Sequence, residues 1–154
     1  MQQRPLEILL YIGQRRGDFV KLGPKDIQDG MLCLQQQKTS QPVYIPLTSR
    51  FQEIIKDIPA DAPSFITTAK GEPFTPAGFT NWFRDMCKEA GLPKGLSPHG
   101  VRKATCRRLA EAGCTPHQIM AISGHKSLSE VTRYTAAANR RDLALQAIAT
   151  LTEH

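Results

Sequence analysis

The chain has 154 residues, a length that suits one domain with one sizeable core. Its hydrophobic fraction of 40% and charged fraction of 22% are typical of globular proteins, and no apolar run approaches the roughly 20 residues of a membrane-spanning helix. The net charge of +6 favours an anionic partner, and nucleic acid is the commonest of these.

The first sixteen residues lack the charged, apolar and small-residue order of a signal peptide. The four cysteines are Cys33, Cys87, Cys106 and Cys114, and they form no CxxC pair. We therefore expect reduced thiols, a cytoplasmic location and no contact with a membrane. The spacings of Cys106 and Cys114 from the nearby histidines match no zinc pattern, so no metal site is expected.

The first third of the chain predicts two helices and a β-hairpin. Apolar residues at helical spacing, Leu6, Leu9, Leu10 and Ile12, predict a helix over 5–13, and residues 17–22 form a second short one. Residues 31–47 contain two runs of strand-forming residues around the polar turn "KTSQ", which predicts a hairpin with Lys38 at its tip.

The remainder is predicted to be mainly helical. A helix over 51–58 ends at Pro59, and short extended pieces follow at 64–68 and 72–74. Three helices then begin with a hydroxyl residue before proline, which is a strong start signal: Thr75-Pro76, Ser97-Pro98 and Thr115-Pro116. Residues 115–118 and 127–130 also match capping boxes.

Candidate functional residues lie around the helix that begins at Ser97. His99 and Arg102 are three residues apart, so they share a helical face near an N-terminus that favours an anion. Either an anion site or an ordinary surface pair accounts for them. The charges from residue 91 to 110 are all basic, which fits either a solvated helix face or a DNA-binding surface.

Tyr134 follows His125 by nine residues and allows two interpretations. It is either a packing residue or a nucleophile. Because a tyrosine hydroxyl is scarcely ionised at neutral pH, a nucleophilic tyrosine needs cationic neighbours.

The residues together carry a family resemblance. The segments "GQRRGD" (13–18), "SPHGVRKATCRRLAEAG" (97–113) and "SGHKS" (123–127), with Lys38 and Tyr134, resemble the catalytic domain of the tyrosine recombinases, the phage integrase family. The resemblance implies a mainly α (α+β) fold, a helical bundle with a small antiparallel β-sheet and hairpin. It also implies site-specific DNA cleavage and rejoining through a 3′-phosphotyrosyl intermediate, without ATP, metal or another cofactor.

The resemblance assigns a role to each matching residue. Tyr134 is the nucleophile, Arg15 and Arg102 bind the scissile phosphate, and Lys38 protonates the leaving 5′ oxygen. His99 and His125 assist proton movement and hydrogen-bond the phosphate, and Asp18 supports the site by orienting neighbouring groups. The expected DNA contacts are basic residues around these positions: Arg16, Lys103, Arg107, Arg108 and Lys126.

The resemblance also predicts partners. The substrate is double-stranded DNA, often of a mobile element, on which the full-length protein assembles as a tetramer, while this chain alone is expected to be a monomer. We expect the N-terminal core-binding domain to be absent, so that 1–154 is a single catalytic domain with weak DNA binding. The helical tail 141–151 is expected to dock on a neighbouring subunit.

One departure and two alternatives accompany this hypothesis. Ser123 stands where a bulkier apolar residue is usual before Gly124-His125. The first alternative is a non-catalytic helix-turn-helix module, with Gly113 in the turn and 116–123 as the recognition helix. The second is a type IB topoisomerase, which uses the same chemistry without exchange of partner strands.

Overall fold

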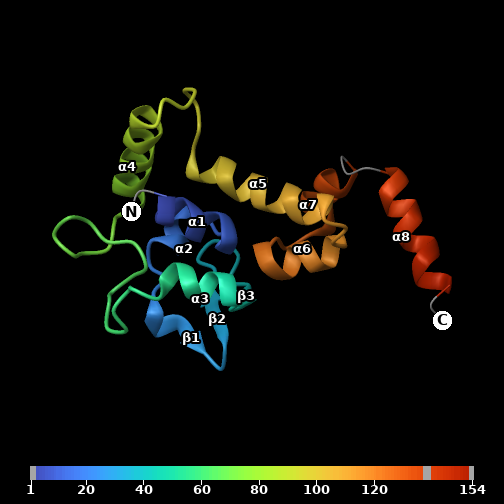
Figure 1. Ribbon diagram of the computed structural model, residues 1–154, viewed down its shortest axis with the longest axis horizontal. Coiled ribbons are helices and arrows are strands. Elements are labelled where there is room, and N and C mark those ends of the chain that lie inside the picture. Colours follow the sequence, from blue (N-terminus) through green and yellow to red (C-terminus); the bar gives the residue numbers. More distant parts are fainter. Residues whose placement is uncertain (1–2, 137–139, 153–154) are drawn as a thin grey trace.

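The computed structural model describes residues 3–136 and 140–152, most of them in helices around one small sheet (Figure 1). The helices are α1 (Gln3–Ile12), α2 (Arg16–Phe19), the 3-10 turn η1 (Pro24–Asp26), α3 (Ser49–Ile55), α4 (Pro76–Glu89), α5 (Pro98–Glu111), α6 (Pro116–Ser123), α7 (Leu128–Ala136) and α8 (Arg140–Thr152). The strands are β1 (Ile27–Gln28), β2 (Met31–Gln35) and β3 (Pro42–Pro46). The predicted fold class is confirmed.

The helix α1 is present as predicted, but its buried face is turned slightly from the expected one. Ile8, Leu9 and Ile12 are fully buried, whereas Leu6 is 44% exposed. The 3.6-residue period brings Ile8 into the core with Ile12, and Leu6 falls at the margin of that stripe. The expected helix over 17–22 is a shorter one, α2, which ends at Phe19.

The sheet is antiparallel with strand order β1-β2-β3. Leu32 pairs with Ile45 and Leu34 with Val43, so the apolar residues of both hairpin strands alternate onto the core face. The loop of residues 36–41 joins these strands and carries Lys38, as predicted. The short strand β1 had no sequence signal, and the expected extended pieces 64–68 and 72–74 meet only in a bridge between Thr67 and Pro73.

Three of the four sequence caps form as expected. The hydroxyls of Thr75, Ser97 and Thr115 each accept a hydrogen bond from the backbone N–H three residues later. The fourth differs: the Ser127 hydroxyl lies 3.0 Å from the hydroxyl of Ser129, and the Glu130 N–H donates to the Ser127 carbonyl instead. Helix α7 therefore begins with a serine–serine contact rather than the predicted capping box.

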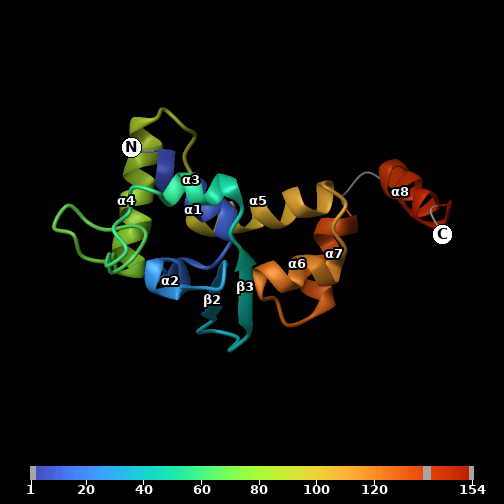
Figure 2. The same ribbon diagram turned by 60° about the horizontal axis from the view of Figure 1, so that its bottom comes forward.

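Two apolar clusters form the interior, and α5 extends from one to the other. The larger cluster lies among α1, the sheet, α3 and α4, and Val101 of α5 packs at its margin. The smaller one joins Cys106 and Ala110 of α5 to Ile119 of α6 and Val131 of α7. Figures 1 and 2 show α5 crossing the molecule between these two parts. None of the helices described is long and apolar enough to cross a membrane.

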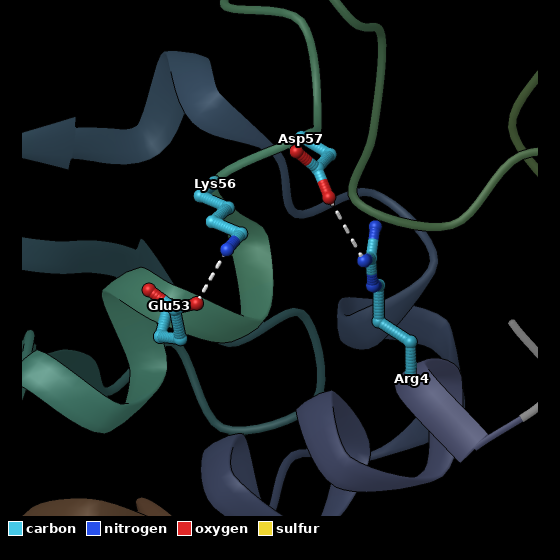
Figure 3. A network of polar contacts seen from close by, with 4 residues as sticks. All are labelled: Arg4, Glu53, Lys56 and Asp57. Atoms are coloured by element: carbon cyan, nitrogen blue, oxygen red, sulfur yellow. Dashed lines mark hydrogen bonds and ion pairs between the residues drawn. The ribbon is translucent and has the colours of Figure 1, made fainter.

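In both views α8 stands at the opposite end from α4 (Figures 1 and 2). Around α3, Arg4 of α1 forms an ion pair of 3.2 Å with Asp57, and Lys56 forms one of 2.5 Å with Glu53 (Figure 3). These pairs are exposed to solvent, which screens their charges, so they contribute little to stability.

Candidate active site

The corner between α1 and α2 sets the position of Arg15. Gly13 adopts a left-handed backbone conformation with φ of 66°, and a Cβ there would meet the Thr105 methyl group at 2.8 Å. Only glycine fits both the conformation and the close approach of α5. Arg15 then occupies the N-cap position of α2 in extended conformation, half-buried beside the hairpin loop.

Two buried glutamines tie this corner to the rest of the site. The Gln14 amide donates to the carbonyl of Ile122 at 2.7 Å, and the Gln36 amide donates both to Gln14 Oε1 and to the Ser123 carbonyl at 2.6 Å. The Gln36 oxygen in turn accepts from Arg15 at 3.1 Å and from the Thr39 hydroxyl at 2.7 Å. A single side chain of the hairpin therefore joins α2 to the end of α6.

Sequence reasoning missed both glutamines. A signal existed for Gln36, because it continues the inward alternation of Leu32 and Leu34 on β2. A polar residue at such an inward position needs partners, since burying an amide without a hydrogen bond is costly. Gln14 carried no comparable pattern.

Arg102 is the most completely enclosed charged side chain of the site, with 2% of its surface exposed. Its Nη1 donates to the carbonyls of Gly13 at 2.9 Å and Ser123 at 2.8 Å, and its Nη2 lies 3.4 Å from His125 Nε2. Burial lowers the pKa of Arg102 to about 10, with Arg15 as the next cause, so it remains cationic at neutral pH. A guanidinium has five N–H groups, so two remain beyond these three contacts.

The histidines differ in their surroundings. His125 follows the left-handed Gly124 that ends α6, and its Nδ1 lies 2.5 Å from the Ser123 hydroxyl. Burial, and then the charge of Arg102, lowers the pKa of His125 to about 4. His99 is exposed in the first turn of α5, and burial followed by the nearby Lys103 and Arg102 lowers its pKa. His99 and Arg102 are expected from the sequence to share one face of α5. Arg102 is buried whereas His99 is exposed, so the two side chains lie on opposite sides of the boundary between interior and surface.

Lys38 is exposed on a loop whose neighbouring residues are anchored. Asp18, nearly buried on α2, accepts a hydrogen bond of 3.0 Å from the Gln37 backbone N–H. On the other side, Thr39 donates to Gln36, which also holds Arg15. Asp18 therefore makes a hydrogen bond to the base of the Lys38 loop, and its orienting role stays a prediction.

Tyr134 lies on α7, half-buried against the smaller apolar cluster. Its hydroxyl accepts a hydrogen bond of 3.3 Å from Arg133 Nη2, and the Arg133 guanidinium lies 5.1 Å from the centre of the ring. Tyr134 is among the groups that raise the pKa of Arg102 against the larger effect of burial, so the two side chains lie within electrostatic range of each other. Arg133 is a cationic neighbour that sequence reasoning did not single out.

The expected DNA-contact residues are exposed, but they do not form one surface. Lys103 and Arg107 are four residues apart on α5 and share a face, and Arg107 is also 3.8 Å from Glu111. Arg108 lies on another flank of α5, where a cavity is lined by Leu10, Tyr11 and Leu109. Arg16 donates to the Thr80 hydroxyl of α4 at 2.5 Å. Lys126 adjoins His125 in the turn before α7.

The helix-turn-helix alternative fits this arrangement poorly. Its recognition helix would be α6, whose Ile119 is buried in the smaller cluster. The last carbonyls of α6, those of Ile122 and Ser123, accept hydrogen bonds from Gln14, Gln36 and Arg102. Helix α6 therefore forms a wall of the site. Across 3–136 and 140–152, no group of three or more His, Cys, Asp or Glu side chains is placed to hold a metal ion.

The helical domain thus gathers Arg15, Arg102 and His125 around Gln36 and the Ser123 carbonyl, and Tyr134 lies on the helix that follows His125. A model described as "Phage integrase family" matches residues 2–141, and the chain belongs to this family.

Individual relatives agree with this membership. The tyrosine recombinase XerD of Listeria innocua serovar 6a is 26% identical over 145 residues, which cover 86% of this chain and 49% of the relative. The tyrosine recombinase XerC of Bradyrhizobium diazoefficiens is 28% identical over 149 residues, covering 94% and 46%. The chain thus spans about half the length of these curated relatives.

Solved structures show the same fold. A lambda integrase (75–356) dimer bound to a COC′ core site superposes with a TM-score of 0.73 at 25% identity, covering 90% of this chain and 53% of that chain. The lambda integrase catalytic core superposes with a TM-score of 0.68 at 24% identity, covering 80% and 79%. The second match shows that the two chains share a fold over most of both lengths.

Proposed function

We propose that this chain is the catalytic domain of a site-specific tyrosine recombinase that cleaves and rejoins double-stranded DNA through Tyr134. The observation that carries the proposal is the network that joins Arg15, Arg102 and His125 through the Gln36 side chain and the Ser123 carbonyl. These groups come from three distant segments of the chain. A packing role alone gives no reason to gather two arginines, which repel each other, at one place.

An anionic ligand between the arginines would offset this repulsion. A phosphate oxygen accepts charge-assisted hydrogen bonds from guanidinium groups, which are stronger than neutral ones. Arg15 and Arg102 would thereby bind the scissile phosphate and stabilise the extra charge of its transition state. Because Arg102 is fixed by two carbonyls before DNA binds, little reorganisation is needed at the reaction step.

The chemistry then takes place in two reversible transfers. The Tyr134 oxygen forms a bond to phosphorus as the bond from phosphorus to the 5′ oxygen breaks, and Lys38 protonates that leaving oxygen. His99 and His125 move protons near Tyr134. A 5′ hydroxyl of the partner duplex then attacks the phosphotyrosyl ester and releases Tyr134. The ester conserves the bond energy, so the rejoining step needs no ATP.

Arg133 supports the nucleophilic role of Tyr134. A guanidinium that donates to the tyrosine oxygen would reach the atom that attacks phosphorus, and hydrogen bonds from a cation are stronger than neutral ones. The contact thus supplies one of the cationic neighbours that a tyrosine nucleophile requires.

DNA binding and assembly complete the proposal. The exposed residues Arg16, Lys103, Arg107 and Lys126 would contact DNA phosphates. Arg108 lies on another flank of α5 and is the least suited of the predicted set. On α8, Leu145, Ile148 and Leu151 are among the most exposed apolar side chains described, and they would dock on a neighbouring subunit in a tetramer on DNA. A cytoplasmic location remains part of this proposal.

Covalent trapping tests the proposed reaction. The protein is incubated with a pool of nicked duplexes whose flanking sequence is randomised, so that cleavage beside the nick lets the short 5′-hydroxyl fragment diffuse away. We expect an adduct that resists SDS, is lost in Tyr134→Phe and is retained in Tyr44→Phe, a matched control on the exposed face of the hairpin. Sequencing the trapped DNA gives the site. Transfer of the trapped strand to a second duplex then distinguishes a recombinase from a type IB topoisomerase.

A further inference from the structure

The hairpin loop that carries Lys38 turns one side chain inward. Thr39 is partly buried, whereas its neighbours on both sides are exposed. The Thr39 hydroxyl lies 2.7 Å from Oε1 of Gln36 and 3.2 Å from the backbone nitrogen of Gln41. The loop therefore meets the buried amide of Gln36 through this hydroxyl.

The partners of Gln36 define the orientation of its amide. Arg15 can only donate a hydrogen bond, so the atom that faces it is the Gln36 oxygen. The Ser123 carbonyl can only accept, so the Gln36 nitrogen faces that group. A Cβ at Gly124 would overlap the same amide, which therefore fits closely against bare backbone. Turning the amide over would break both hydrogen bonds.

The orientation of Gln36 in turn fixes the Thr39 hydroxyl. Its hydrogen must point at Gln36 Oε1, which is an acceptor, and its lone pairs are left for the Gln41 N–H. Oε1 has two lone pairs, one for Thr39 and one for Arg15. A single oxygen atom thus links the Lys38 loop to an arginine of the site.

Lys38 has an anchored neighbour on each side. Before it, the Gln37 N–H donates to Asp18 at 3.0 Å, and after it, the Thr39 side chain donates to Gln36. A lysine side chain is long and flexible, so a loose backbone would spread its ammonium group over a wide volume. The two anchors restrict the ammonium group to the volume that the side chain itself can reach.

We propose that Thr39 is a positioning residue for Lys38, and that its bond to Gln36 sets the distance from the lysine to the phosphate between the arginines. The consequence rests on the proposed function. As the Tyr134 oxygen bonds to phosphorus, the bond from phosphorus to the 5′ oxygen breaks, and that oxygen takes a proton from Lys38 Nζ. The proton returns to Lys38 when a 5′ hydroxyl attacks the phosphotyrosyl ester.

A sulfur substitution in the DNA tests the route through Lys38. In a duplex of the trapped sequence, sulfur replaces the bridging 5′ oxygen of the scissile phosphate. A thiol ionises at about pH 8.5 and leaves readily as a thiolate, whereas an alkoxide needs a proton. A defect in the proton donor therefore disappears with the sulfur duplex, while a defect in phosphate binding persists.

The oxygen duplex should reveal the defect. Thr39→Val keeps the shape of the side chain and removes its hydroxyl, so the adduct should form about five- to tenfold more slowly, the effect of one hydrogen bond. Lys38→Ala should be at least about a hundredfold slower, because it removes the proton donor. With the sulfur duplex, both variants should react within about twofold of the wild-type rate.

Two further variants serve as controls. Thr39→Ser keeps a hydroxyl and should restore the wild-type rate with the oxygen duplex. Ser40→Ala removes the exposed hydroxyl of the next residue but leaves its backbone N–H, which donates to the Gln36 carbonyl, so it should react as the wild type does. Equal slowing of Thr39→Val with both duplexes, or a normal rate with the oxygen duplex, would overturn the proposal.

The contact itself can be measured without DNA. Thr39→Val removes the acceptor of the Gln41 N–H, so that amide should exchange with solvent about two- to tenfold faster. An unaltered exchange rate would show that Thr39 does not hold the loop. If the wild type trapped no DNA at all, the proposed recombinase function would fail, and amide exchange would still decide the role of Thr39 in the loop.

Discussion

Arg15 donates a hydrogen bond of 3.1 Å to Gln36, so an arginine of the site is held by the same hairpin that carries Lys38. Gln36 also donates to Gln14 and to the Ser123 carbonyl, which connects this hairpin to the turn that bears His125. Hairpin, arginine and histidine are therefore positioned by one buried amide.

Replacing that amide is expected to weaken the whole domain. Gln36→Leu would leave Gln14 Oε1 and the Ser123 carbonyl without this donor, lowering the free energy of unfolding by about 2–4 kcal/mol in urea titrations. Gln37→Leu is the matched control, because its side chain is exposed, and should change stability by about 0.5 kcal/mol or less. Equal effects of the two substitutions would contradict the positioning role of Gln36.

The two arginines are expected to differ when each is replaced by lysine. Arg102→Lys loses a fork that reaches two buried carbonyls, so the free energy of unfolding should fall by about 2–4 kcal/mol. Arg15→Lys affects a half-buried side chain and should cost about 1 kcal/mol. Both variants should form the covalent adduct at least tenfold more slowly, since a lysine cannot make the bidentate contact. Urea titration measures the effect on stability, and the trapping assay measures the effect on adduct formation. A normal rate of adduct formation in Arg15→Lys would show that Arg15 does not bind the phosphate.

Stability is expected to depend on pH through His125. Its pKa is about 4 in the folded protein and near 6.5 when unfolded, so the unfolded state binds more protons between these values. The stabilisation is complete above pH 6.5 and is lost as the pH falls towards about 4. Because the ring is only half-buried and solvent screens its charge, we expect a loss of about 1–2 kcal/mol.

The variant His125→Gln should flatten this dependence, as measured by urea titrations across the same pH range. Some dependence of the same sign should remain, because the pKa of His99 is also lowered. An unchanged pH profile in His125→Gln would show that His125 is not buried as a neutral ring.

The Asp18 carboxylate should control the order of the Lys38 loop. Asp18→Ala removes the acceptor of the Gln37 N–H, so the exchange of that amide with solvent should become about tenfold faster, the effect of one charge-assisted hydrogen bond. Asp18→Asn keeps an acceptor oxygen and should exchange at an intermediate rate. Amide exchange measured by NMR reports this directly, and an unaltered rate in Asp18→Ala would refute the role assigned to Asp18.

The exposed residues of α8 should matter for assembly rather than folding. The triple substitution of Leu145, Ile148 and Leu151 by serine is expected to change the melting temperature little, because these side chains are exposed. Leu143→Ser, which removes a side chain packed on the smaller cluster, should lower it and is the contrasting variant. Crosslinking on trapped DNA measures assembly, and full assembly by the triple variant would argue against docking through α8.

The sequence predicted those parts of the protein that depend on local chemistry. The hydroxyl-proline starts at Thr75, Ser97 and Thr115 define helix ends through backbone groups a few residues away, and all three are confirmed. The hairpin with Lys38 in its loop followed from alternation and turn residues in the same way. Ser127 failed as a cap because its neighbour Ser129 offered a competing hydroxyl.

The connections within the site could not be derived locally. The bonds of Gln36 and Arg102 reach residues 21 to 89 positions away, and such contacts depend on how the helices pack. Arg133 was overlooked because its contact with Tyr134 depends on side-chain orientation rather than on spacing. Ser123, noted in the sequence only as an unusual residue, proves to be a hydrogen-bond partner of His125.

The central claim is that Tyr134 forms a covalent bond to DNA, and the most direct test is to locate that bond. A protease that cleaves on the C-terminal side of lysine cuts the trapped protein after Lys126. The peptide that begins at Ser127 contains one tyrosine among residues 127–154, which is Tyr134. Mass spectrometry after nuclease treatment should find a nucleotide attached to Tyr134 in this peptide. Attachment at Tyr11, Tyr44 or another residue, or an adduct that persists in Tyr134→Phe, would contradict the account.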